Sequence, residues 1–64
     1  MKIVVNGEPR AVTAATLSQL LVELGFSGRV ATAVNEAFVA ASLREQHRLN
    51  EGDRVEILAP MQGG

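Results

Sequence analysis

The sequence predicts an α+β fold in which a mixed β-sheet covers one amphipathic helix. Short runs rich in Val and Ile stand near both ends of the chain, and one stripe of leucines recurs at helical spacing between residues 17 and 24. A chain of 64 residues is long enough for one domain only. We therefore expect residues 1–64 to form a single domain. One helix cannot cover both faces of a sheet, as a doubly wound fold requires.

The first predicted elements are two paired strands. Residues 1–5 have the composition of a strand, and Asn6-Gly7 follows them directly. This pair adopts positive φ angles more readily than any other, as a tight hairpin turn requires. We therefore expect a second strand over residues 10–13 that pairs back on the first.

The helix is predicted from its apolar stripe and from its two ends. The stripe consists of Leu17, Leu20, Leu21 and Leu24. Thr16 can cap the first free amides, with Gln19 completing a capping box, and Gly25 suits the left-handed residue that follows a last turn.

The C-terminal half is expected to add strands. Residues 30–35 are β-branched and small, and Phe38-Val39 is expected to continue this strand beyond a turn at 35–37. Residues 42–49 are too weakly periodic to assign and suit either a short helical turn or an irregular loop.

A turn cluster at 50–53 precedes the last predicted strand, residues 54–58, in which polar and apolar residues alternate. Pro60 ends this pattern, and residues 60–64 are expected to form an exposed, flexible tail. The resulting order ββαββ matches the β-grasp, with four to five strands. In that fold the last strand lies parallel to the first, so the chain would end from the middle of the sheet.

Composition excludes several classes of function. Six basic and seven acidic side chains give a net charge of −1, and the two aromatic residues, Phe26 and Phe38, provide no stacking platform, so nucleic acid is not an expected partner. No apolar run approaches the roughly 20 residues of a membrane span. We expect a cytoplasmic protein with no membrane partner.

Enzymatic and metal-binding residues are also scarce. The chain has no cysteine and no glycine pattern for phosphates or dinucleotides, and its one histidine, His47, is expected to be a solvated surface residue. The acidic residues lack ligand-like spacing and are interpreted as solubilising charge: Glu23, Glu36, Glu45, Glu51, Asp53 and Glu56. We expect no catalytic residue, bound metal or bound cofactor.

The C-terminal Gly63-Gly64 is the strongest candidate for chemistry. From Pro60 the tail can extend about 17 Å, enough for Met61, Gln62 and Gly63 to thread a partner's active site. Glycines let a narrow channel close around the backbone. The carboxylate of Gly64 resists nucleophiles until an ATP-using partner adenylates it. The alternative is an ordinary frayed terminus.

Several segments together resemble the ThiS family over essentially the whole chain. They are residues 1–8 (MKIVVNGE), Thr16-Leu17, residues 20–24 (LLVEL), residues 33–35 (AVN), residues 51–57 (EGDRVEI) and the ending Gln62-Gly63-Gly64. The sequence departs from the family pattern at Ala40, where proline is frequent, and in the loop from Ser42 to His47.

The resemblance implies a ubiquitin-like sulfur carrier. Gly64 would be adenylated by a ThiF-type adenylyltransferase, which uses the ATP, and converted to a thiocarboxylate. The thiocarboxylate would deliver sulfur to thiazole synthase for thiamine biosynthesis, and a separate protein would donate the sulfur. The chain itself would be a co-substrate of these enzymes.

Strand alternation also suggests where a partner docks. If Ile3 and Val5 face the helix, Val4 points outward, and Leu58 points outward from the last strand. We expect Val4 and Leu58 to be neighbours and to form, with Met61, a small exposed apolar patch. Scattered surface hydrophobic residues are the alternative.

Three other functions remain open from the sequence. The chain could be the small subunit of a molybdopterin synthase, although those are usually longer. It could be a protein modifier, which would leave adducts on lysine. It could also be a non-conjugating β-grasp interaction module, in which case removal of Gly64 would have no effect.

Overall fold

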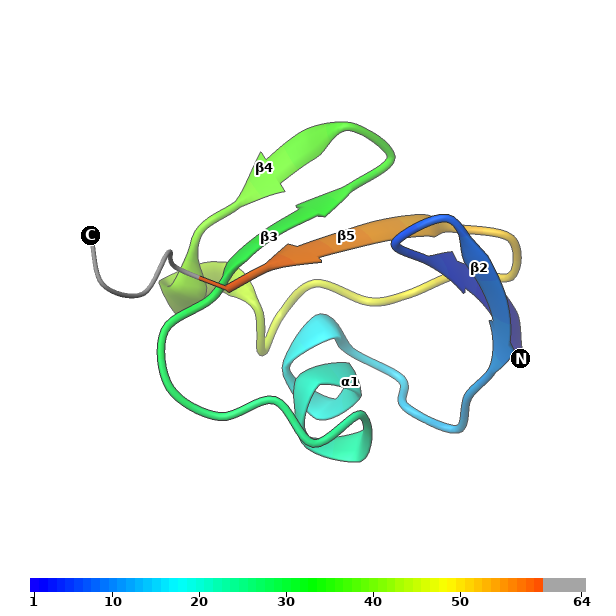
Figure 1. The fold of residues 1–64 in the computed structure, drawn as a ribbon, viewed down its shortest axis with the longest axis horizontal. Helices are drawn as coiled ribbons and strands as arrows, with labels where there is room; N and C mark the ends of the chain where they lie inside the picture. The colour runs from blue at the N-terminus through cyan, green and yellow to red at the C-terminus, as the bar shows by residue number, and fades with distance from the viewer. Residues whose placement is uncertain (60–64) are drawn as a thin grey trace.

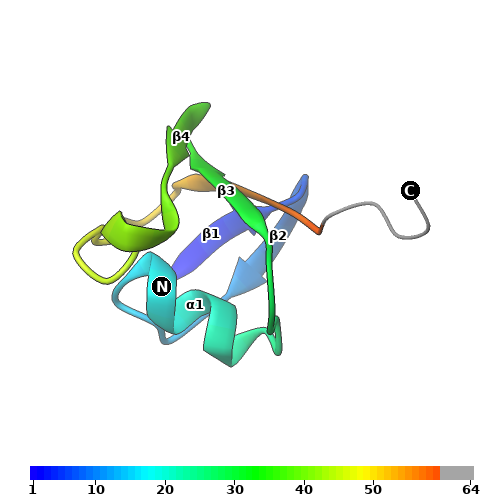
Figure 2. The ribbon, with the colours of Figure 1, turned by 90° about the vertical axis from the view of Figure 1, so that its left-hand side faces the viewer.

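The structure, a computed structural model, describes residues 1–59, so the predicted tail 60–64 lies outside the described residues. The elements, in chain order, are β1 (Lys2–Val5), β2 (Glu8–Ala11), α1 (Leu17–Glu23), β3 (Ala31–Val34), β4 (Ala37–Val39), the 3-10 turn η1 (Ala41–Leu43) and β5 (Arg54–Leu58). Figures 1 and 2 show α1 on one side of the sheet. Within residues 1–59 no helix is long and apolar enough to cross a membrane.

The strand order confirms the predicted β-grasp. It is β2-β1-β5-β3-β4, so the last strand occupies the centre of a five-stranded sheet. β5 is parallel to β1, with Val5 opposite Val55, and antiparallel to β3. The chain therefore leaves the sheet from its middle, as the element order predicted.

The first hairpin has the predicted turn but a different second strand. Asn6 and Gly7 have φ angles of 50° and 84°, and they form a two-residue loop that places Val5 opposite Glu8. β2 therefore begins at Glu8, and the expected strand over 10–13 is wrong by two residues. A two-residue turn fixes this register because pairing must resume at once.

The second hairpin corrects the predicted third strand. Asn35 and Glu36 have φ angles of 51° and 73° and reverse the chain, so Val34 pairs with Ala37. Phe38 and Val39 therefore belong to a separate antiparallel strand, β4, and do not continue β3.

Both predicted helix ends are present. Thr16 Oγ1 accepts a hydrogen bond of 3.2 Å from Gln19 N, whereas Gln19 Oε1 accepts one of 2.9 Å from Ala15 N, one residue before the cap. Gly25 has a φ of 83°, and the N–H groups of Gly25 and Phe26 donate to the carbonyls of Val22 and Leu21. This is the Schellman arrangement, which satisfies the last helical carbonyls.

An aliphatic core lies between α1 and the inner face of the sheet. It contains Ile3, Val5, Val12, Ala14, Leu17, Leu20, Leu21, Val34, Val39, Leu49, Val55 and Ile57. The segment 42–49 that the sequence left unassigned contains the end of η1 and then a loop, which ends by burying Leu49. The core lies on one face of the sheet, and no other element of residues 1–59 covers the opposite face, here called the outer face.

Candidate functional site

The predicted reactive residues follow β5 in the sequence, after Ala59 and Pro60. Gly64, Gly63, Gln62 and Met61 lie outside the described residues, so the site is described from Leu58 and the outer face around it. Along β5 the buried residues Val55 and Ile57 alternate with exposed Arg54, Glu56 and Leu58. This alternation confirms that Leu58 points to the outer face.

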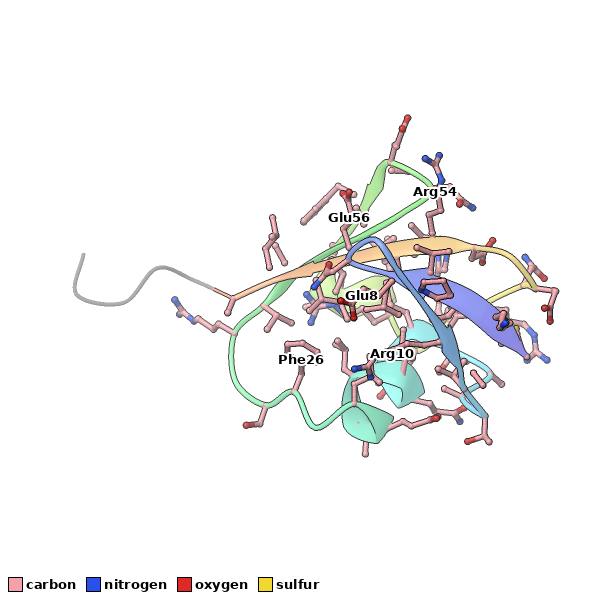
Figure 3. The ribbon with its side chains drawn as sticks, turned by 45° about the vertical axis from the view of Figure 1, so that its right-hand side comes forward. Glu8, Arg10, Phe26, Arg54 and Glu56 are labelled. Atoms are coloured by element: carbon pink, nitrogen blue, oxygen red, sulfur yellow. The ribbon has the colours of Figure 1, made fainter. Side chains whose placement is uncertain are left out.

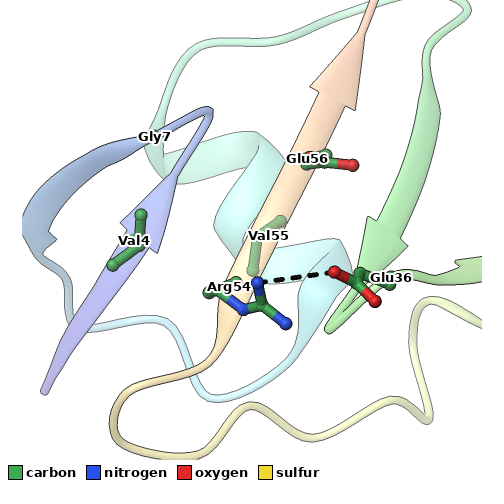
Figure 4. A pocket seen from close by; sticks show the side chains of 6 residues that line it. All are labelled: Val4, Gly7, Glu36, Arg54, Val55 and Glu56. Atoms are coloured by element: carbon green, nitrogen blue, oxygen red, sulfur yellow. Dashed lines mark ion pairs between the residues drawn. The ribbon is translucent and has the colours of Figure 1, made fainter.

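The predicted contact between Val4 and Leu58 is wrong. The parallel register pairs Val4 with Arg54, so Leu58 lies four residues further along β5, roughly 13 Å away at the rise of a strand. Val4 is half-buried and lines a shallow pocket with Gly7, Glu36, Arg54, Val55 and Glu56 (Figure 4). Val4 and Leu58 point to the same face of the sheet, but the register of β1 and β5 places them at different positions along the strands, so they do not form one patch.

Leu58 instead belongs to an apolar patch over β3, β4 and β5. The register places Ala31 opposite Leu58 and Ala33 opposite both Phe38 and Glu56. A shallow, mostly apolar depression lies among these residues. Phe38 is 72% exposed and Leu58 66% exposed. We call Ala31, Ala33, Phe38 and Leu58 the outer patch.

Sequence reasoning missed Phe38 because it treated residues 38–39 as a continuation of the third strand. The available signal was the turn expected at 35–37, which would have placed Phe38 on a new strand if it had been interpreted as a reversal of the chain. Once the chain reverses at Asn35-Glu36, Phe38 must stand beside Ala33 on the outer face while Val39 is buried.

Charged groups border the outer patch on one side. Arg54 Nη1 lies 3.6 Å from Glu36 Oε2, and both side chains are largely exposed (Figure 4). Arg54 and Glu56 point away from the helix, whereas Glu8 and Arg10 lie toward it beside Phe26 (Figure 3). An exposed ion pair such as Arg54–Glu36 stabilises a fold by at most about 1 kcal/mol. Little stability is therefore lost if either charge pairs with a partner instead.

Two turn asparagines hold the ends of β5. Asn6 Nδ2 donates to the carbonyl of Ile57 at 3.1 Å, and Ile57 N donates to Asn6 Oδ1 at 2.8 Å. At the opposite end, Arg54 N donates to Asn35 Oδ1 at 2.9 Å, and Asn35 Nδ2 donates to Asp53 Oδ1 at 3.1 Å. The strand that precedes the tail is therefore anchored by both hairpin turns.

Three of the acidic residues interpreted as solubilising charge have structural roles. Asp53 is 8% exposed and accepts a hydrogen bond from Asn50 N as well as from Asn35. Glu51 accepts from the N–H of Lys2. Glu23 accepts from Thr13 and Ala14, and these bonds, that from the Thr13 N–H first, hold the pKa of Glu23 below its ordinary value.

His47 is half-buried, and its carbonyl accepts the N–H of Leu17 at the start of α1. The prediction of a solvated surface histidine is therefore only partly right, because the side chain is half-buried and the backbone carbonyl binds the first residue of α1. Among the residues that the structure describes, no three His, Asp or Glu side chains are grouped as a metal site would require.

Comparison with known proteins points in one direction. The model of the ThiS family matches residues 3–64. The chain is 43% identical over 61 residues to the sulfur carrier protein ThiS of Thermus thermophilus, which covers 92% of this chain and 94% of that one. It is 44% identical over 66 residues to a thiazole synthase of Paramagnetospirillum magneticum, covering all of this chain but only 20% of that protein.

Solved structures agree with the sequence relatives. A crystal structure of a thiamine biosynthesis protein (ThiS) from Geobacter metallireducens has a TM-score of 0.84 at 29% identity and covers both chains completely. A solution structure of a thiamine biosynthesis protein from the same organism has a TM-score of 0.83, also at 29% identity, and covers all of this chain and 88% of that one.

Proposed function

This chain belongs to the ThiS family, and we propose that the carboxylate of Gly64 is the group that carries sulfur. The chain is a sulfur carrier protein for thiamine biosynthesis. The observation that supports Gly64 is the central position of β5, which precedes the Gly63-Gly64 ending by four residues in a sequence without cysteine. A terminal acyl group is then the natural site to attach sulfur covalently.

The proposed chemistry has two steps, both catalysed by partners. A carboxylate oxygen of Gly64 attacks the α-phosphorus of ATP, which forms an acyl adenylate and releases pyrophosphate. A hydrosulfide ion released by a separate donor protein then attacks the acyl carbon. The C–S bond forms, the C–O bond to AMP breaks, AMP leaves, and loss of the sulfur-bound proton gives the thiocarboxylate. The ATP belongs to the ThiF-type adenylyltransferase, and the carrier acts as its substrate.

Thiazole synthase is the proposed acceptor of the sulfur. A segment similar to the whole of this chain makes up 20% of a longer protein named thiazole synthase. Joining the two in one polypeptide raises the effective concentration of one for the other, which favours a direct functional contact. We place this exchange in the cytoplasm, as the composition predicted.

The outer patch is the proposed docking surface for the adenylating partner. Phe38 and Leu58 are large, apolar and exposed, and Leu58 lies two residues before Pro60. A partner that covers this patch therefore holds the domain close to the residues that enter its active site. Met61, predicted as part of an apolar patch with Val4 and Leu58, lies outside the described residues, and Val4 lies apart from Leu58.

The adenylation step is tested by exchange of labelled pyrophosphate into ATP. The assay contains an active ThiF-type enzyme and either the complete chain or a variant without Gly64. We expect exchange only with the complete chain. Equal exchange with the shortened chain would refute Gly64 as the acceptor, and lysine adducts in place of thiocarboxylate would identify a protein modifier.

A further inference from the structure

Asn6 makes contacts that its place in a hairpin turn does not require. A two-residue turn needs a residue that tolerates positive φ, and the φ of 50° at Asn6 meets that need. The side chain, however, is directed across to β5, where it accepts from the Ile57 N–H at 2.8 Å and donates to the Ile57 carbonyl at 3.1 Å.

These bonds replace a missing stretch of strand. β1 ends at Val5, opposite Val55, because the chain turns back toward β2. β5 continues to Leu58, and on its other side Ile57 and Leu58 are opposite Thr32 and Ala31. Without the Asn6 carboxamide, the peptide groups of Ile57 on the β1 side would lack this protein partner in the middle of a sheet.

These hydrogen bonds bear on the reaction because Ile57 is followed in the sequence by Leu58, which belongs to the outer patch, and then by the residues that lead to Gly64. We propose that Asn6 is a positioning residue for the reactions at Gly64: its carboxamide keeps the end of β5 in the sheet and thereby fixes where residues 60–64 begin. This inference rests on the proposed function. An end of β5 that detaches would lengthen the connection between the sheet and Gly64 and lower the effective concentration of the Gly64 carboxylate in the partner's active site.

The chain supplies its own matched control. Asn35 has nearly the same φ, 51°, in the other hairpin turn, and its side chain binds the N–H of Arg54 at the far end of β5. Glycine accepts positive φ at either position. Asn6→Gly and Asn35→Gly therefore each keep a turn and remove one side-chain anchor, the first near the tail and the second away from it.

The first measurement is amide hydrogen exchange at Ile57, with the Leu20 amide of α1 as the reference for global unfolding. Asn6→Gly is expected to accelerate Ile57 exchange relative to Leu20 by about tenfold, as expected for loss of part-buried hydrogen bonds. Asn35→Gly is expected to leave that ratio unchanged. An unchanged ratio in Asn6→Gly would overturn the proposal. This measurement involves no partner, so its result is independent of the proposed function.

The second measurement is adenylation by a ThiF-type enzyme with ATP, at saturating carrier, together with the dissociation constant of the complex. In Asn6→Gly the rate at saturation is expected to fall several-fold while the dissociation constant stays unchanged, and Asn35→Gly is expected to match the wild type in both. An equal fall in both variants would reduce Asn6 to a structural role and overturn the proposal. If the wild-type chain is not adenylated, the proposed function fails and the positioning role at Gly64 falls with it.

Discussion

Glu23 joins the segment before α1 to the last turn of the helix. Its carboxylate accepts from Thr13 N at 3.1 Å, from Thr13 Oγ1 at 3.0 Å and from Ala14 N at 2.8 Å. These donors, the Thr13 N–H first, stabilise the ionised form and hold the pKa of Glu23 below its ordinary value. The stabilisation is present above the unfolded-state pKa and is lost as the pH falls through the lower folded-state pKa.

We therefore predict that Glu23→Gln unfolds at lower denaturant concentration than the wild type at neutral pH. The gap between the two midpoints should narrow as the pH falls below the ordinary pKa of a glutamate and through the lower folded-state pKa of Glu23, because the carboxylate is then progressively protonated and neutral like the glutamine. Urea titrations at a series of pH values measure the gap between the midpoints. Glu45→Gln, at an exposed residue, is the control. A gap that stays constant down to the lowest pH would contradict this role for Glu23.

The outer patch gives a second substitution to test. Leu58→Asp should weaken docking to a ThiF-type enzyme by about tenfold or more, because it places a charge in the apolar contact. The thermal midpoint should change little, since Leu58 is 66% exposed. Val22→Asp is the matched control: Val22 is 77% exposed but lies on α1. Equal affinities for the two variants, measured by calorimetry, would remove the patch from the docking surface.

The two hairpins explain which parts of the fold the sequence could predict. Asn6-Gly7 was recognisable because glycine adopts positive φ without steric cost. At Asn35-Glu36 the same reversal uses a glutamate at a φ of 73° in place of glycine. A turn was expected at 35–37, but not that it reverses the chain, so β4 was missed and with it the outward direction of Phe38. The patch assigned to Val4 and Leu58 failed for a related reason, since alternation gives a face but not a register.

The strained turn supplies a stability prediction. Glu36→Gly should be more stable than Glu36→Ala by about 1 kcal/mol, because both lose the carboxylate near Arg54 but only alanine keeps a Cβ at positive φ. For a domain of this size the difference corresponds to roughly 4 to 8 °C in the thermal midpoint. Equal midpoints in calorimetric scans would show that the turn stores no such strain.

The whole domain can be understood as a support for its last strand. β5 is central, is flanked by β1 and β3, and is held by Asn6 and Asn35 at its two ends. The strand and helix order was enough to predict this central position, because few arrangements of one hairpin, one helix and two further strands bury a single apolar stripe. The side-chain anchors were not predictable, since they join residues that are 51 and 19 positions apart in the sequence.

The central claim is that sulfur is carried on Gly64, and intact-mass spectrometry tests it most directly. The chain is incubated with an active ThiF-type enzyme, ATP and a sulfur source, then weighed and fragmented. We predict a mass increase equal to the exchange of one oxygen for sulfur, located at Gly64 and absent when ATP is omitted. An unchanged mass, or sulfur on any other residue, would contradict the account.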